Sequence, residues 1–164
     1  MRTIWRTGFG EILGLGLEAV DISGTGHAIG GVVGINGWKG WWFYGGGGRI
    51  INCSSTGKAG GESGVGGLVG YNCEGSIASS YYTGTVAGNE RVGGLIGFNA
   101  GSIIMSYSTA AVEGVVEVGG LVGSNDLISP GLDRVSSWGS IYASYSIGTG
   151  RKDYVEPDDQ WRSC

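Results

Sequence analysis

The sequence predicts an all-β protein built as a parallel β-solenoid (β-helix) with coils of about 26–27 residues. Three observations predict it. A Gly-Gly pair returns along the chain at spacings of 36, 27 and 26 residues. The segments between the pairs are rich in Val, Ile, Tyr and Ser and are interrupted by Gly and Asn, which is typical of short strands and turns. No ten-residue stretch has helical periodicity, and 37 glycines among 164 residues penalise helices.

Four copies share the pattern, each in two blocks. The first block reads IGGVVGIN, VGGLVGYN, VGGLIGFN and VGGLVGSN, at residues 29–36, 65–72, 92–99 and 118–125. The second block reads GRIINCSSTG, GSIASSYYTG, GSIIMSYSTA and GSIYASYSIG, at residues 48–57, 75–84, 101–110 and 139–148. A half-copy, LGLEAVDISGTG, precedes them at 15–26. A propeller blade requires about 40–45 residues, so the shorter period favours one solenoid coil per copy.

Identical coils stacked at about 4.8 Å place equivalent residues in columns. We expect three apolar columns: Val32, Leu68, Leu95 and Leu121; Ile50, Ile77, Ile103 and Ile141; and Val86 with Val112. A column of small residues contains Cys53, Ser80, Ser106 and Ser144. The column Asn36, Asn72, Asn99 and Asn125 suits either a left-handed corner or a ladder of amides bonded between coils. Cys53 and Cys73 fall in different columns, which predicts no disulfide between them.

Two copies carry insertions directly after the asparagine. They read GWKGWWFYGGG at Gly37–Gly47 and DLISPGLDRVSSW at Asp126–Trp138. We expect one β-solenoid domain over residues 1–150, with the repeats from about 29 to 148 and a non-repeating tail or cap at 151–164.

The segments VGGLVGYN…GSIASSYYTGTVAG and VGGLIGFN…GSIIMSYSTAAVEG resemble consecutive GLUG motifs, named after a Gly-Leu-hydrophobic-Gly core. The resemblance runs from about Ile29 to Gly148. Similar repeats occur in large bacterial surface and secreted proteins, including adhesin-like passengers and the non-catalytic regions of some immunoglobulin A metallopeptidases. The resemblance therefore implies an extracellular or cell-surface scaffold and no activity. The opening residues show no export signal, because glycines and Glu11 interrupt any apolar segment.

Insertions within solenoid repeats emerge on one face, which is often the binding face. Equivalent corners three coils apart place the roots of the two insertions about 14 Å from each other, with Tyr71 and Phe98 between them. We expect a groove there that binds a glycan or a protein surface, because aromatic rings suit both. The first insertion would supply the aromatic loop Trp38, Trp41, Trp42, Phe43 and Tyr44. Alternatively, these aromatics cap the end of the rod or pack against a second copy.

An enzyme is the competing hypothesis. Glu74, Asp126 and Asp133 are the carboxylates expected near the groove, and they would serve a small glycan hydrolase or lyase. A single histidine, His27, excludes a multi-histidine metal site, so we expect no metal and no cofactor.

Composition restricts the other partners. A net charge of −4 with 15% charged residues gives no basic footprint for nucleic acid. No apolar run is long enough for a membrane span. A flat ice-binding face would require regular threonines, whereas this chain repeats Ser-Tyr. Open strand edges at the solenoid ends, or the aromatic loop, would allow self-association.

Overall fold

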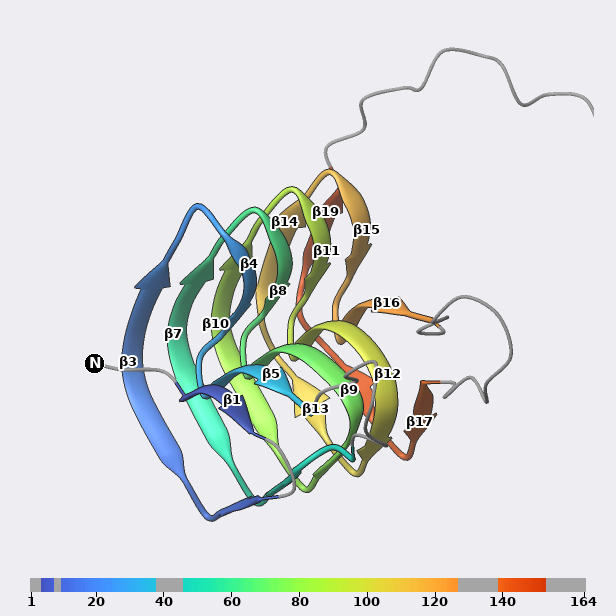
Figure 1. Ribbon diagram of the computed structural model, residues 1–164. Coiled ribbons are helices and arrows are strands. Elements are labelled where there is room, and N and C mark those ends of the chain that lie inside the picture. Colours follow the sequence, from blue (N-terminus) through green and yellow to red (C-terminus); the bar gives the residue numbers. More distant parts are fainter. Residues whose placement is uncertain (1–3, 8–9, 38–45, 127–138, 153–164) are drawn as a thin grey trace, which may run out of the picture.

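A computed structural model describes residues 4–7, 10–37, 46–126 and 139–152 (Figure 1). These residues form strands and turns and contain no helix. Every strand pairing among them is parallel, and the pairs follow the predicted coil spacing. The predicted parallel β-solenoid is therefore confirmed.

The described strands make five stacked coils. The first contains β1 (Ile4–Thr7), β2 (Glu11–Leu13), β3 (Gly16–Ser23) and β4 (His27–Gly30). The second contains β5 (Val33–Asn36), β6 (Arg49–Ile51), β7 (Ser54–Gly60) and β8 (Ser63–Gly66), and the third β9 (Val69–Ala78), β10 (Tyr81–Ala87) and β11 (Glu90–Gly93). The fourth contains β12 (Ile96–Ile104), β13 (Tyr107–Ser108), β14 (Ala111–Gly114) and β15 (Val116–Gly119). The fifth contains β16 (Val122–Asn125), β17 (Ser140–Tyr142), β18 (Tyr145–Ser146) and β19 (Gly150–Lys152). The half-copy at 15–26 thus belongs to a coil whose first strand begins at Ile4.

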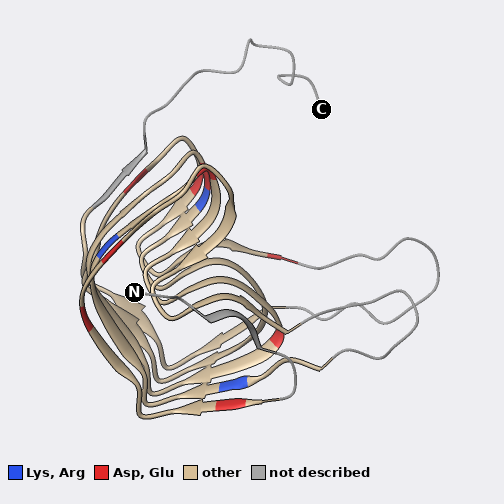
Figure 2. Ribbon diagram, turned by 60° about the vertical axis from the view of Figure 1, so that its left-hand side comes forward, with Lys and Arg blue, Asp and Glu red and all other residues tan. Residues whose placement is uncertain are grey.

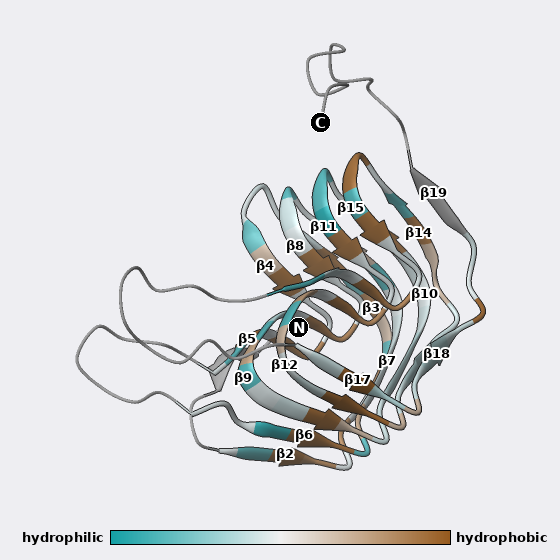
Figure 3. Ribbon diagram, turned by 90° about the vertical axis from the view of Figure 1, so that its right-hand side faces the viewer, coloured by the Kyte–Doolittle hydropathy of each residue, from teal (hydrophilic) through white to brown (hydrophobic). Residues whose placement is uncertain are grey.

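The first four coils contribute to three sheets that enclose the core, and the described part of the fifth coil contributes to the first two (Figure 2). Sheet 1 has the order β1-β5-β9-β12-β16. The short strands β6 and β17 pair with the C-terminal halves of β9 and β12, and β2 pairs with β6. Sheet 2 contains β3, β7, β10, β13, β14, β18 and β19, and sheet 3 has the order β4-β8-β11-β15. Figure 3 shows apolar residues recurring at the same place on successive strands, as the column prediction requires.

The predicted apolar columns form the core. Strand register aligns the isoleucine column through β6, β9, β12 and β17, and it aligns Val86 with Val112. Leu68, Leu95 and Ile77 are fully buried, and burying each such side chain contributes about 1.5–3 kcal/mol. Ile141, on the last coil, is 42% exposed because no further described coil covers it.

The two glycines of each Gly-Gly pair have different tasks. A Cβ on Gly66 would overlap the carbonyl oxygen of Val69, so the first glycine permits the tight reversal from sheet 3 to sheet 1. A Cβ on Gly67 would overlap the ring of the buried Tyr82 and the carbonyl of Gly94. The second glycine therefore permits close packing across the core.

The asparagine column is a ladder of amides. Each Nδ2 donates to the Oδ1 of the next coil, at 2.9, 2.8 and 2.7 Å from Asn36 to Asn125. The other amide hydrogen of each asparagine goes to the carbonyl of a glycine in its own coil: Gly48, Gly75, Gly101 and Gly139. Left-handed corners belong to other columns, such as Asn52, Ser79, Met105 and Ala143, with φ between 46° and 54°. Of the two roles that the sequence left open, the ladder is correct.

The small-residue column is a second ladder. The backbone N–H groups of Cys53, Ser80 and Ser106 each donate to the serine hydroxyl of the following coil, at 3.1, 3.2 and 3.1 Å. The hydroxyls of Ser80 and Ser106 donate in turn to carbonyls two residues earlier in the chain. Small polar residues are thus required here because they complete the coil-to-coil bonding.

Breaking the amide ladder in the middle of the rod should be costly. Asn99→Leu removes the acceptor of one amide hydrogen of the buried Asn72, and it removes the amide that donates to the Gly101 carbonyl and to Asn125. The free energy of unfolding should therefore fall by about 2–4 kcal/mol. Asn125→Leu, at the exposed end of the same ladder, should cost less than about 1 kcal/mol. Urea unfolding followed by circular dichroism measures both, and equal losses would contradict the ladder's role.

The close approach at the second glycine makes another prediction. Gly67→Ala should destabilise the fold by about 3 kcal/mol, because the methyl group has no space beside Tyr82. Gly26→Ala is the matched control, since a Cβ there meets nothing within 4 Å, and it should change stability by less than about 0.5 kcal/mol. Thermal unfolding of both variants decides the matter, and a Gly67→Ala protein as stable as the parent would refute this packing.

Candidate functional site

Both insertions are rooted at the asparagine corner. The amides of Asn36 and Asn125 bond to Gly48 and Gly139 across the bases of the insertions, each at 3.0 Å. Coils without a long insertion close with the same bond, at 3.2 and 3.1 Å. The ladder therefore continues unbroken past both roots, which lie on the same side of the rod (Figure 2).

Six of the predicted site residues lie outside the described residues. They are the five members of the aromatic loop and one carboxylate: Trp38, Trp41, Trp42, Phe43, Tyr44 and Asp133.

Tyr71 and Phe98 lie side by side between the two roots. They are register partners on β9 and β12, one residue before the ladder asparagines. Their rings meet edge to face, with centroids 5.7 Å apart and planes at 90°. Both side chains are half-buried. A Cβ on Gly64 of sheet 3 would overlap the ring of Tyr71, so Tyr71 packs directly against that strand.

Arg91 adds a charged group to this aromatic pair. Its guanidinium lies over the ring of Phe98, 5.7 Å from the centroid, which is within range of a cation–π contact. It also pairs with Glu90 at 2.9 Å and with Glu117 of the next coil at 3.1 Å. Partial burial lowers the pKa of Arg91, but the hydrogen bond to Tyr71 and the two carboxylates outweigh this and raise the pKa above its ordinary value. We define Tyr71, Phe98, Arg91, Glu90 and Glu117 as the corner cluster.

Sequence reasoning missed the charged part of the corner cluster. A signal was present, because Arg91 and Glu117 are 26 residues apart, one coil. Two opposite charges that are one coil length apart in the sequence predict an ion pair between adjacent coils.

Glu74 and Asp126 lie at the insertion corner on different coils. Glu74 is an extra residue in β9, because the register passes from Ala100–Cys73 directly to Ser102–Ser76. Its φ of 61° accommodates the bulge, and it accounts for a spacing of 27 rather than 26 residues. Asp126 is exposed, and its backbone N–H donates to the carbonyl of Asn99 at 3.1 Å. The backbones of Glu74 and Asp126 are therefore two coils, about 10 Å, apart along the rod.

Neither Cys53 nor Cys73 is in a disulfide, as the columns predicted. Burial, with a smaller contribution from the charge of Glu74, raises the pKa of the Cys73 thiol to about 11.

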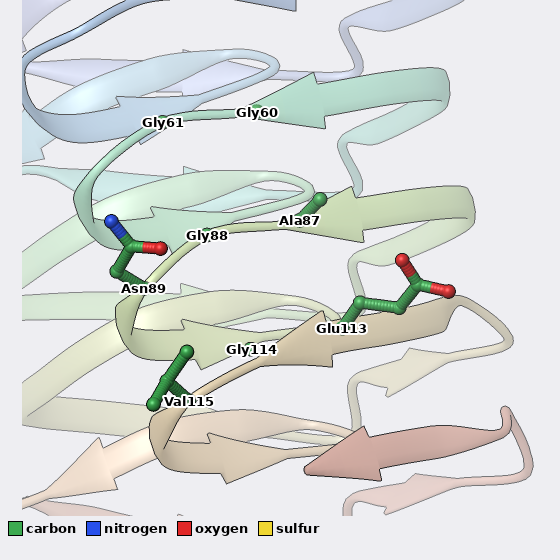
Figure 4. Close-up of a pocket in the computed structure, with 8 residues that line it drawn as sticks. All are labelled: Gly60, Gly61, Ala87, Gly88, Asn89, Glu113, Gly114 and Val115. Carbon is green, nitrogen blue, oxygen red and sulfur yellow. The ribbon is translucent and has the colours of Figure 1, made fainter. Parts of the chain in front are cut away.

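An open pocket of about 410 Å³ lies at the opposite corner, between sheets 2 and 3. Gly60 and Gly61, Ala87 to Asn89, and Glu113 to Val115 line it on three successive coils. Figure 4 shows the side chains of Asn89 and Glu113 at its two ends, without convergence. Backbone groups of the lining are already paired between coils, for example Gly88 N–H with the Glu113 carbonyl. This pocket therefore offers a ligand fewer polar groups for hydrogen bonding than the corner cluster does.

Sheet 2 carries a row of tyrosines that sequence reasoning also did not use. Tyr81, Tyr107 and Tyr145 stack with centroids 5.0 and 5.4 Å apart and planes within 7° of parallel. The hydroxyl of Thr109 donates to that of Thr83 beside them, at 2.9 Å. The recurring Ser-Tyr pair was the signal for this row. The rings present their edges outward, because their faces cover one another.

Among the described residues, no group of three or more His, Cys, Asp or Glu side chains is placed to hold a metal ion. The same residues include no helix that is long and apolar enough to cross a membrane.

Comparison with known proteins identifies one segment. Residues 88–113 match the family described as the GLUG motif, so the chain contains a GLUG motif and the resemblance is confirmed there. The matched segment spans the end of the third coil and most of the fourth, and its register is shared with the neighbouring coils. No curated protein and no solved structure matches the chain significantly.

The raised pKa of Cys73 predicts slow alkylation. At pH 8 a thiol with a pKa of about 11 has about 100-fold less thiolate than one at the ordinary value of 9.0. Iodoacetamide should therefore label Cys73 at least about 100-fold more slowly in the folded chain than in urea, by peptide mass spectrometry. Glu74→Gln should accelerate labelling modestly, since it removes the smaller of the two causes. Labelling of folded Cys73 at the rate seen in urea would show that the thiol is not buried.

Proposed function

We propose that the chain is a non-catalytic, extracellular β-solenoid module that binds a glycan at the corner between its two insertions. One observation carries the proposal. The asparagine ladder joins both roots through consecutive hydrogen bonds, with the coils of Tyr71 and Phe98 between them. It holds the roots of the two insertions at a fixed separation of three coil spacings, about 14 Å.

The chemistry of the corner cluster supports a sugar ligand. Two partly exposed rings provide apolar surface for the C–H faces of a sugar. The guanidinium of Arg91 and the carboxylates of Glu90 and Glu117 supply donors and acceptors for hydroxyls beside those rings. These groups stand on strands rather than on loops, and a rigid support reduces the entropy lost on binding.

The surface location rests on the resemblance to repeats of secreted and surface proteins. In such a module the solenoid presents the insertions, and the insertions and the corner cluster make the contacts. A protein surface is the other partner that aromatic insertions suit, because Trp and Tyr dominate interaction hot spots.

A glycan array probed with the purified chain tests the proposal. Phe98→Ala and the double variant Trp41→Ala/Trp42→Ala should each weaken binding of any positive glycan by about 10- to 100-fold, because each removes stacking surface worth roughly 1–3 kcal/mol. Tyr145→Ala is the matched control, since that exposed tyrosine lies on sheet 2, and it should bind as the parent does.

Three outcomes would redirect the assignment. A folded parent that binds no glycan would contradict the proposal, and equal losses in the Tyr145→Ala control would remove the site from the corner. Release of a cleaved product that disappears in Glu74→Gln would identify a hydrolase or lyase instead. Circular dichroism of each variant separates loss of binding from loss of fold.

A further inference from the structure

Large exposed apolar side chains gather at one end of the rod. Seven such residues occur in the described chain, and five lie on the terminal strands β15, β17 and β18 or directly after them: Val116, Ile141, Tyr142, Tyr145 and Ile147. Tyr142 and Ile147 are each 73% exposed. Of the other two, Leu13 lies on the first coil and Met105 on the fourth. Among the described residues, the fifth coil thus presents the surface that every inner coil covers with its successor.

The hydrogen-bonding ladders also reach this end. Asn125 accepts the amide of Asn99 and bonds its own coil at Gly139. The inner asparagines give their second amide hydrogen to the following coil. The stacked tyrosines end at Tyr145, whose ring is covered by Tyr107 on one face only among the described residues. Strands β16 to β19 each have a single described neighbour.

The first coil offers matching residues in the same columns. Ile12 precedes Ile50 in the inward isoleucine column that ends at Ile141. Leu13, which is 61% exposed, begins the adjoining outward column that ends at Tyr142. In the tyrosine column the first coil has Gly16, which leaves space for a ring. Two exposed apolar residues therefore sit at the two ends of one column.

We propose that copies of this chain stack head to tail, with the fifth coil of one copy against the first coil of the next. Sheets 1 and 2 would continue across the junction in parallel, as they do at the coil junctions inside the chain. The stack would bring Tyr142 onto Leu13 and Ile141 onto Ile12. A two-fold contact of fifth coil on fifth coil would reverse the strand direction and lose this register.

Head-to-tail stacking joins two different surfaces. Such an interface leaves one free surface of each kind on every oligomer, so assembly does not close and grows into filaments. The proposal is independent of glycan binding, because it uses the ends of the rod and not the insertion corner.

Sedimentation velocity of the full chain tests it. The parent should show a mass that rises with concentration and passes beyond the dimer. Tyr142→Lys and Leu13→Lys should each be monomeric, because a charged side chain blocks one end of the rod. An equimolar mixture of the two variants should form a dimer and nothing larger, since each variant keeps the end that the other lacks.

Met105→Lys is the matched control. Met105 is 59% exposed, similar to Leu13, but it lies at the corner between sheets 1 and 2 and not at an end. This variant should assemble as the parent does. A parent that stays monomeric, a mixture of end variants that stays monomeric, or a parent that stops at the dimer would each overturn head-to-tail stacking. Far-ultraviolet circular dichroism confirms that every variant is folded.

Discussion

The amide hydrogen bond between stacked asparagines is the constraint on which the rest of the structure depends. A buried amide without its partners costs more than a formed hydrogen bond contributes, so neighbouring coils must meet in one register. Once Asn72 and Asn99 are aligned, the isoleucines, valines and serines of the two coils are aligned as well. The same alignment sets the positions of Tyr71, Phe98 and Arg91.

The two ladders and the glycines work together. The amide ladder fixes the corner within sheet 1, and the serine ladder fixes the corner between sheets 1 and 2. The first glycine of each Gly-Gly pair then lets the backbone reverse sharply, and the second lets it approach a side chain across the core, which is Tyr82 at Gly67 and a serine at the other three pairs. Polar groups, turns and apolar packing therefore all select one stacking distance. This agreement between hydrogen bonding, backbone conformation and core packing specifies a single fold.

Spacing alone predicted the solenoid, the columns and the absence of a disulfide, because a repeat converts sequence distance directly into spatial register. Spacing could not choose between a left-handed corner and a ladder for the asparagines, since both use the same residue type. It also missed Arg91, because a pair across adjacent coils becomes visible only when outward-facing positions are aligned too. Glu74 was placed near the corner, but its role as a bulge residue depends on a backbone angle.

The asparagine corner has a further property. One residue separates Asn99 from its glycine, two separate Asn72, eleven separate Asn36 and thirteen separate Asn125, yet all four close with the same amide–carbonyl bond. Length at this position is therefore decoupled from the geometry of the stack. New sequence can be accepted there in evolution, or grafted there by design, one coil at a time, while the scaffold that displays it stays the same.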